Sequence, residues 1–488
     1  MLSVPRAAQP PPMKMAEAAP PSKKRKSGRP GSSEPEEISS RELPPAAVME
    51  VPDSRTQPPP PGAEGAEEGV DYISTLPDAV LGDIISLLPT REGARTQTLA
   101  SRWRHLWRSA PLNLDYDDLP AEGDLLIALI AQILSAHTGS GRRLRISANH
   151  LCHHPATVDA WLRSPALSNF QELEFCRAAN HLPILPAVAA STFRHSSSLC
   201  VATISQCRLS DGIFETLHFP QLKQLTLEEV SISEGSLHRV IAGCPVLESM
   251  LLNRSTGFKC VRICSPSLRA IGVRVRPGRQ PKIIIEDAPY LERLLRLDLE
   301  EGLDISVISA PNLEIMGCLS YKRPIHFQGL CAVFPTTLHT IKTLSIYVYY
   351  NSVETVLSFM SCFPCLEKLY IKQDVAPYNI SWRRKHKSHI RSLDLRLKTV
   401  VLKNYRGVLG DVNFAMFFVL HAKMLELLRF KVRGGCSNNF IARQRSLLQL
   451  EKRASRDARF EFTNDTYHRK LEDINHARDL SVADPFEC

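Results

Sequence analysis

FPQLKQLTL, residues 219–227, is the stretch that decides how this chain folds, because close copies of it return along the sequence. Each copy has a proline, a variable residue and a leucine, and apolar residues follow within the next few places. The first five prolines are 21 to 25 residues apart. The sixth comes after 53 residues, close to two such periods, and we expect TTLHTIKTLSIYV near Leu338 to supply a degenerate copy in that gap. The prolines of the six copies are Pro220, Pro245, Pro266, Pro289, Pro311 and Pro364.

A repeat of this length with a Leu-x-x-Leu-x-Leu core is the signature of leucine-rich repeats. Each unit buries its strand and return segment only against its neighbours, so the units stack into a curved solenoid. Proline marks the turn before each strand, where a missing amide donor costs least. Short strand-like runs such as RRLRISANHL begin near Pro111, and we predict the solenoid over residues 116–385. The alternative is an unrelated α/β domain whose loops carry proline, which six phased copies disfavour.

Beyond the repeats, LKTVVLKNYRGVLGDVNFAMFFVLHAKMLELLRFKV (residues 397–432) predicts a strand, a turn at Gly407, an amphipathic helix and a second strand. We then expect a long polar helix over residues 443–462. Since the last repeat of a solenoid needs a polar outer face, this region is interpreted as a cap. The predicted apolar face of the amphipathic helix consists of Phe414, Phe417, Phe418, His421 and Leu425.

Before the repeats lies ISTLPDAVLGDIISLLPTREGARTQTLASRWRHLWR, residues 73–108. Ser74 or Thr75 can cap a first helix, with Pro77 in its first turn and Pro89 as its end. Apolar residues recur at three-and-four spacing in this helix and again in a second helix after a polar connection. About forty residues cannot bury so much apolar surface among themselves. The surplus faces either the rest of this chain, as in an ordinary helical hairpin, or another protein.

The order L-P-D-x-V-L-x-x-I-x-x-L-L-P, then R-T-x-x-L-x-x-R-W-R-x-L-W, resembles the F-box over residues 72–115. Ala100 and Ser101 depart from the plant pattern, which has Ser and a basic residue before the Arg-Trp pair. The C-terminal region resembles the FBD domain in its LKxVxLxxYxG and FxxFxLxxAxxLExL phrases and in Arg453-Ala454-Ser455 through Phe462. The order of the three parts is similar to that of the plant F-box, leucine-rich-repeat and FBD proteins.

This resemblance implies a non-catalytic substrate receptor of a Skp–cullin–F-box (SCF) ubiquitin ligase. The helices would dock on a Skp-type adaptor and, through it, on cullin and RING subunits, while the repeats bind an unidentified target protein. The two tryptophans would be hot spots because each buries a large apolar area. The expected adaptor-binding residues are Leu76, Pro77, Leu81, Ile84, Leu87, Leu88, Pro89, Leu99, Trp103, Leu106 and Trp107.

Residues 1–69 hold 15 of the 35 prolines and few aromatic residues, and we predict that they are disordered. They contain a contiguous basic cluster, Lys23, Lys24, Arg25 and Lys26, flanked by prolines. Such a cluster on a flexible tail is typical of a nuclear import signal, although an ordinary solvated charge run has the same composition. We therefore expect the protein in the nucleus, with or without a cytoplasmic fraction.

The remaining composition points away from other classes of function. The sequence contains no run of eighteen apolar residues, the length that a membrane-spanning helix requires. Because no secretory signal is found, we expect the 13 cysteines to be reduced thiols. The net charge of +9 allows nucleic acid binding, but the charge is dispersed and no nucleic-acid-binding motif accompanies it. Cys362 and Cys365 form a lone C-x-x-C, and His153 and His154 lack further ligands, so we predict neither metal nor cofactor. No catalytic motif is found, and we expect no enzyme activity.

The sequence thus predicts an α/β chain in which a small helical F-box module precedes a leucine-rich-repeat horseshoe capped by an α+β FBD domain. The predicted parts are a disordered tail (1–69), the F-box (70–115), the repeats (116–385), the FBD domain (386–465) and a flexible C-terminal tail (466–488). The alternative function is that of a nuclear protein–protein interaction scaffold outside any ligase.

Overall fold

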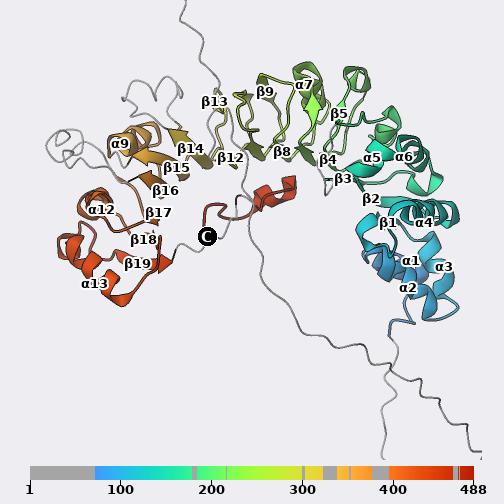
Figure 1. The fold of residues 1–488 in the computed structure, drawn as a ribbon, viewed down its shortest axis with the longest axis horizontal. Helices are drawn as coiled ribbons and strands as arrows, with labels where there is room; N and C mark the ends of the chain where they lie inside the picture. Colours follow the sequence, from blue (N-terminus) through green and yellow to red (C-terminus); the bar gives the residue numbers. More distant parts are fainter. Residues whose placement is uncertain are drawn as a thin grey trace, which may run out of the picture. The chain divides into compact units, whose positions relative to one another are not determined.

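A computed structural model gives the fold of this chain and separates residues 1–70 from residues 71–488 as two units. It describes residues 72–177, 184–215, 217–298, 303–321, 338–350, 353–375, 395–464, 471 and 473–487. The basic cluster at Lys23–Lys26 and the predicted disordered tail lie outside these residues. Within them, most strands of the second unit lie side by side in one curved parallel sheet (Figure 1).

Fourteen described strands form this sheet, and every neighbouring pair is parallel. Parallel strands require crossover connections, and here each repeat supplies one strand and its return. The strands, in their order across the sheet, are β1 (Leu112–Asp115), β2 (Gly141–Ser147), β3 (Glu172–Cys176), β4 (Val201–Ser205), β6 (Gln224–Glu228), β8 (Ser249–Asn253), β10 (Ala270–Arg274), β12 (Arg293–Arg296), β14 (Ile315–Tyr321), β15 (Thr343–Tyr350), β16 (Lys368–Val375), β17 (Thr399–Tyr405), β18 (Leu427–Val432) and β19 (Arg459–Asn464).

The repeated phrase explains this register. Leu225 pairs with Met250, Met250 with Ile271 and Ile271 with Leu294, so the same position of successive phrases forms one buried row. Leu344 continues the row because β15 pairs with both β14 and β16. The expected degenerate copy near Leu338 is therefore confirmed. The leucine of each Pro-x-Leu is buried as well: Leu222, Leu247, Leu268, Leu291, Leu313 and Leu366.

The main core lies between the sheet and the return segments on its outer side (Figure 1). In some repeats the return is helical, and in others it adds to two small parallel sheets, β5–β7 and β9–β11–β13. The helices of this layer are α4 (Gly123–Ala136), α5 (Ala148–His153), α6 (Pro155–Leu162), α7 (Glu234–Ala242) and α9 (Val353–Cys362). The short strands are β5 (Arg208–Leu209), β7 (Ser231–Ile232), β9 (Cys260–Cys264), β11 (Lys282–Asp287) and β13 (Asp304–Val307).

The C-terminal region extends the same sheet, because β17 pairs with β16 and β19 with β18. Helix α12 (Leu409–His421) buries Phe414, Phe417 and Phe418 in the main core, as its periodicity predicts. The predicted polar helix over residues 443–462 is wrong beyond Leu447. Helix α13 (Asn438–Leu447) ends there because Gln449 adopts a left-handed conformation, and β19 takes up residues 459–464.

The sequence prediction of a flexible tail over residues 466–488 does not describe residues 473–487. Ile474, Leu480 and Phe486 are buried against the inner face of the sheet, and a short 3-10 helix, η7 (Ala477–Ser481), lies beside β6, β8 and β10. Figure 1 shows this segment along the side of the sheet opposite the helices. Among the described helices, none combines the length and the apolar character that a membrane crossing requires.

Candidate protein-docking surfaces

The helical module before the sheet has a small core of its own. Helices α1 (Asp78–Ile85) and α3 (Trp103–Ser109) pack together, with α2 (Thr90–Arg95) between them in sequence. The residues that are buried in this core are Leu81, Ile85, Trp103, Leu106 and Ala110, and Leu76 and Trp107 pack against it.

The side chain of Arg102, rather than the expected caps, fixes the start of the module. Neither Ser74 nor Thr75 caps α1, whose first residue follows Pro77. Instead, the Arg102 guanidinium donates to the carbonyls of Ser74 and Leu76 and pairs with Asp78 at 2.7 Å. The sequence interpretation of Pro89 is also corrected, because α1 ends at Ile85 and Pro89 is the N-cap of α2. Proline suits a helix start, where its missing N–H has no partner to lose.

Polar contacts attach this module to the beginning of the sheet. The Thr90 hydroxyl donates to the carbonyl of Asn113 in β1 at 2.7 Å and accepts from the N–H of Asp115 at 2.8 Å. The Asn113 amide donates to the carbonyl of Ser86. Since Thr90 and Ser86 are buried, these bonds replace water and hold the module on the first strand.

The structure divides the predicted adaptor-binding residues into three groups. Leu81, Trp103 and Leu106 are buried, with Trp103 only 8% exposed, so we reassign these three from the contact surface to the interior of the module. Leu76, Leu88 and Trp107 are half-buried. The exposed group consists of Pro77, Ile84, Leu87, Pro89 and Leu99.

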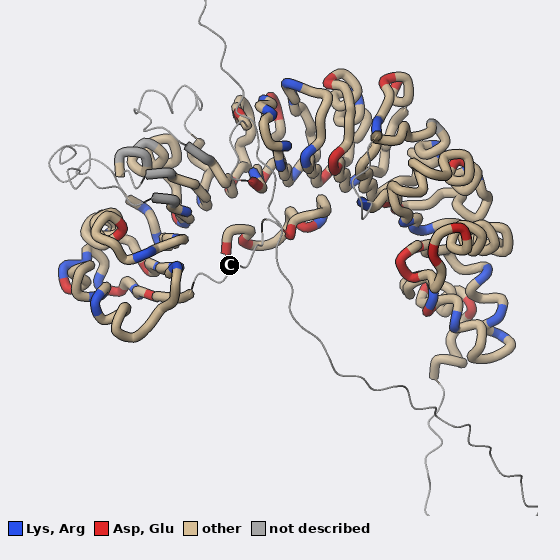
Figure 2. Tube along the Cα trace, viewed as in Figure 1, with Lys and Arg blue, Asp and Glu red and all other residues tan. Residues whose placement is uncertain are grey.

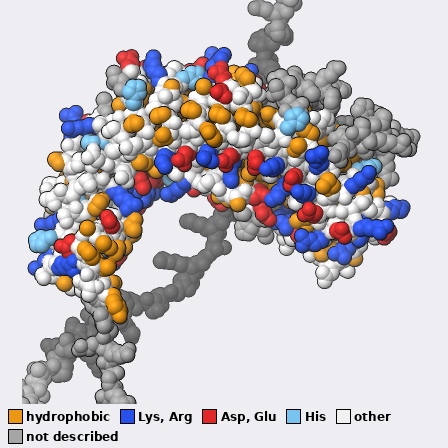
Figure 3. All heavy atoms as spheres, turned by 180° about the vertical axis from the view of Figure 1, so that it is seen from behind, with side chains coloured by type: hydrophobic (Ala, Val, Ile, Leu, Met, Phe, Trp, Pro, Cys, Tyr) orange, Lys and Arg blue, Asp and Glu red, His pale blue; other side chains and the backbone are white. Residues whose placement is uncertain are grey.

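The exposed group forms part of an apolar surface that the sequence did not fully predict. Leu87 is 65% and Leu99 66% exposed, although both are large aliphatic side chains. Tyr72, Ile73 and Val80 are exposed as well and were not among the predicted residues. Figure 3 shows hydrophobic side chains at the surface of the end of the unit that carries α1–α3. Apolar surface gathered in this way is typical of a site where another protein binds.

Trp107 lies at the junction of the module and the sheet. Its ring is edge-on to His137 at 5.5 Å between centroids, and it packs so closely on Gly93 that a Cβ there would be 3.1 Å from the indole. His137 donates from Nε2 to the carbonyl of Ala110 at 2.8 Å, while its buried Nδ1 has no partner among the described residues. A second ring proton would therefore be buried without an acceptor.

We expect stability to fall as the pH falls below about 6.5, the usual pKa of histidine. Burial lowers the pKa of His137, and its bond to Ala110 opposes this only in part. As the pH falls below the pKa of the unfolded chain, His137 binds a proton in the unfolded chain but not in the folded one. The contribution of neutral His137 to the free energy of unfolding is therefore complete above the unfolded pKa and is lost as the pH falls below it. Denaturant midpoints at about pH 7.5 and 5.5 measure the effect, which His137→Gln should weaken and the exposed His105→Gln should leave unchanged. Equal pH dependence in all three proteins would contradict this role.

The inner face of the sheet is the second candidate surface, and both basic and acidic residues lie along it (Figure 2). Arg145 of β2 bonds to Asp115 at 3.0 Å, Asp117 at 2.7 Å and Glu174 at 3.2 Å. Arg143 bonds to Glu174 at 2.8 Å. Burial would raise the pKa of Glu174, but the two guanidinium groups outweigh it and lower that pKa. This end of the inner face is thus a fixed network of opposite charges rather than a free basic patch.

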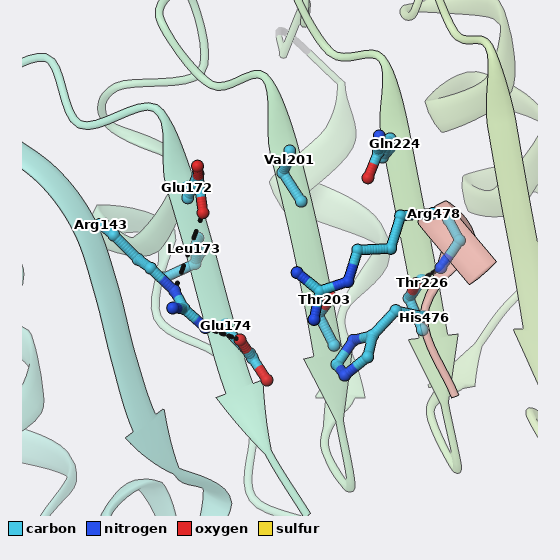
Figure 4. A pocket seen from close by; sticks show the side chains of 11 residues that line it. Arg143, Glu172, Leu173, Glu174, Val201, Thr203, Gln224, Thr226, His476 and Arg478 are labelled. Atoms are coloured by element: carbon cyan, nitrogen blue, oxygen red, sulfur yellow. Dashed lines mark hydrogen bonds and ion pairs between the residues drawn. The ribbon is translucent and has the colours of Figure 1, made fainter. Parts of the chain in front are cut away.

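A shallow hollow lies beside this network, between β3, β4 and β6 (Figure 4). His476 and Arg478 from the C-terminal segment form its other wall, facing Arg143, Glu172 and Glu174. The lining carries both basic and acidic side chains, so the hollow can recognise a charged group. Among the described residues, no three His, Cys, Asp or Glu side chains come together as a metal site; Cys362 is buried and Cys365 is half-buried.

Comparisons with known proteins agree with this architecture. Residues 158–371 match a family model described as the LRR repeats of FBD-associated F-box protein At5g56370, and residues 385–430 match the FBD model. Within the described residues, both matches fall on the strands and returns given above. The expected resemblance to F-box, leucine-rich-repeat and FBD proteins is therefore confirmed.

Three relatives from Arabidopsis thaliana illustrate the extent of the similarity. The putative F-box/LRR-repeat protein At5g02930 is 28% identical over 273 residues, 51% of this chain and 52% of that protein, so the match spans about half its length. The putative F-box/LRR-repeat protein At4g15060 is 25% identical over 391 residues, 75% of this chain and 88% of that protein. The putative F-box/FBD/LRR-repeat protein At1g66290 is 25% identical over 398 residues, 75% and 85% of the two chains.

Proposed function

Because this chain carries the leucine-rich repeats and the FBD segment of FBD-associated F-box proteins, we propose that it is a substrate receptor of an SCF-type ubiquitin ligase. The helices of residues 72–110 act as its F-box and bind a Skp-type adaptor. Through that adaptor the receptor joins a cullin and a RING subunit. The inner face of the sheet binds the target protein, and the basic cluster Lys23–Lys26 directs the chain to the nucleus.

One observation supports the docking role above all others. The module keeps exposed leucines although its own core already contains Trp103, Leu106 and Leu81. Leu87 follows α1 and Leu99 precedes α3, so both connecting segments contribute exposed apolar side chains. Exposing this area costs free energy that a bound adaptor recovers, since burial returns about 25 cal/mol per Å² of apolar surface.

The receptor itself performs no bond-making step in this proposal. It holds a lysine of the target near the ubiquitin thioester carried by the conjugating enzyme. Holding two groups together raises their effective concentration, which accelerates transfer without a catalytic side chain on the receptor. A rigid parallel sheet attached to the module through Thr90 and Asn113 suits this task, because it fixes the target's position relative to the adaptor.

Direct binding of the purified full chain to a purified Skp-type adaptor tests the proposal. We expect Leu87→Asp/Leu99→Asp to weaken the affinity by at least about 30-fold, because a charge replaces an apolar contact at each of two positions and hot-spot residues contribute about 2 kcal/mol or more. Isothermal titration calorimetry gives the affinities, and circular dichroism checks that both proteins are folded.

Leu125→Asp is the matched control, because Leu125 is 75% exposed but lies in α4, outside the module. It should bind the adaptor as the unmodified chain does. Two results would contradict the assignment: no binding by the unmodified chain, or equal loss in the control and the double variant. The first would favour a nuclear interaction scaffold that assembles no ligase.

A further inference from the structure

The C-terminal segment, residues 471 and 473–487, crosses the inner face of the sheet (Figure 1). Its 3-10 helix lies beside β6, β8 and β10, and the N–H of Ala477 donates to the Thr226 hydroxyl of β6 at 2.8 Å. Further along, Asp484 reaches β16 and Phe486 reaches β17. The segment therefore runs across successive repeats, perpendicular to the strands.

Three apolar side chains anchor the segment, and the sheet is shaped to receive them. Leu480 packs over Gly272, where a Cβ would lie 2.6 Å from its Cδ2 atom. Phe486 packs near Gly317, where a Cβ would lie 3.0 Å from its ring, and against Tyr370 at 5.7 Å between centroids. Ile474 is the third anchor and is also buried. Glycines that leave room for these side chains make the face a receptor for this pattern rather than a flat surface.

Basic side chains of five strands hold the backbone and the acidic groups of the segment. Arg274 donates to the carbonyl of Leu471 at 2.9 Å, and Lys403 donates to the carbonyl of Phe486 at 2.8 Å. Arg293 donates to the carbonyls of Leu480 and Val482. The segment has two acidic side chains in contact with the sheet. Asp484 accepts from the Tyr370 hydroxyl at 2.8 Å and from Lys368 at 3.4 Å. Glu487 pairs with Arg429 at 3.3 Å.

This contact is separate from the core that holds the sheet together. Alternate residues of a strand point to opposite faces, so Met250 lies in the main core whereas Leu251 meets the segment. The outer face is already buried by the return segments. The segment thus covers a second apolar face that an empty solenoid would present to other proteins, as repeat proteins do on their concave side.

We propose that the inner face from β6 to β18 is a peptide-binding site, that the C-terminal segment is its built-in occupant, and that a target peptide of the same chemistry displaces this segment. Such a peptide carries aliphatic residues three positions apart, then an acidic residue two positions before an aromatic one, as in Asp484-Pro485-Phe486. Only the identification of the displacing peptide with a ligase target rests on the proposed function. The site itself is independent of it.

The segment can be tested in the full chain by disabling it in place. Leu480→Asp/Phe486→Asp removes two anchors from the occupant and leaves every residue of the sheet unchanged. A fluorescent synthetic peptide of residues 471–488 is then titrated into this variant and into the unmodified chain. We expect the variant to bind the peptide at least about tenfold more tightly, because the tethered segment of the unmodified chain competes at a high effective concentration.

Two controls make the result specific. A peptide that itself carries Leu480→Asp/Phe486→Asp should not bind, and adding Gly272→Val to the variant should abolish binding by filling the Leu480 position. Equal peptide affinity in the unmodified chain and the variant, or no binding to either, would overturn the proposal. No adaptor takes part, so failure here leaves the docking proposal untouched, and failed adaptor binding leaves this site untouched.

Hydrogen exchange of the unmodified chain provides an independent test of displacement. The amide of Ala477, bonded to Thr226, should exchange at least about tenfold faster than the amides of β10, because a detachable segment opens without unfolding the sheet. Equal rates would mean that the segment is a permanent part of the fold, and the proposal would fall.

Discussion

Replacing Trp103 by alanine is expected to destabilise the helical module by about 3–5 kcal/mol, the usual cost of truncating a buried aromatic side chain. The module is small, and five buried residues form its core, of which Trp103 is the largest. Loss of this size should unfold α1–α3 while the sheet remains folded, because the core of the sheet is a separate cluster. Adaptor binding would then be lost although the variant removes no exposed residue.

Leu87→Ala is the matched comparison for Trp103→Ala. Leu87 is exposed, so its truncation should change stability by no more than about 0.5 kcal/mol and weaken only adaptor binding. Thermal unfolding followed by tryptophan fluorescence and by circular dichroism, together with adaptor titrations, separates the two effects. If Trp103→Ala weakens binding while the melting temperature stays unchanged, Trp103 is a contact residue, as the sequence suggested, and its assignment to the module's interior is wrong.

The sequence alone could not predict which of the module's apolar residues are buried and which are exposed. Helical spacing identifies the apolar stripes of residues 73–108 but not which side of each stripe faces inward. That choice depends on how the two helices pack, and here Leu81 and Trp103 meet while Leu87 and Leu99 stay outside. The cap prediction failed for a similar reason, since the start of the module is held by Arg102, 24 residues after Asp78, which donates to Asp78 and to the carbonyl of Ser74.

The repeats were predictable because their information is local and recurs. Leu222 and Leu225 occupy in one unit the places that Leu247 and Met250 occupy in the next, and each copy supports the interpretation of the others. The C-terminal segment has no such support. Its apolar residues are few, and the surface that they bury, including Leu251 and Gly272, is formed some 200 positions earlier in the chain. The three-residue spacing of Ile474, Ala477 and Leu480 was the one available signal.

A second large effect is expected at the junction of two central repeats, where Asp298 accepts from the N–H of Val275 and pairs with Arg296 at 3.1 Å. The side chains of Arg296 and Asp298 are only 4% and 10% exposed. Asp298→Ala would leave the arginine charge buried without its partner and the Val275 N–H without its acceptor. Breaking one side of a buried ion pair costs about 3–5 kcal/mol. Asp298→Asn keeps an acceptor for Val275 and should lose less.

The form of the unfolding curve carries as much information as its midpoint. In a solenoid each repeat contacts only its neighbours, so a weak junction between β10 and β12 should let the two halves unfold separately. The segment of residues 471–487 opposes this, because it bonds to β6 on one side of the junction and to β16 and β17 on the other. We therefore expect Asp298→Ala to unfold in one shifted transition in urea. Combined with Leu480→Asp/Phe486→Asp, it should unfold in two. A single transition in the combined variant would mean that neighbouring strands alone carry the cooperativity of the sheet.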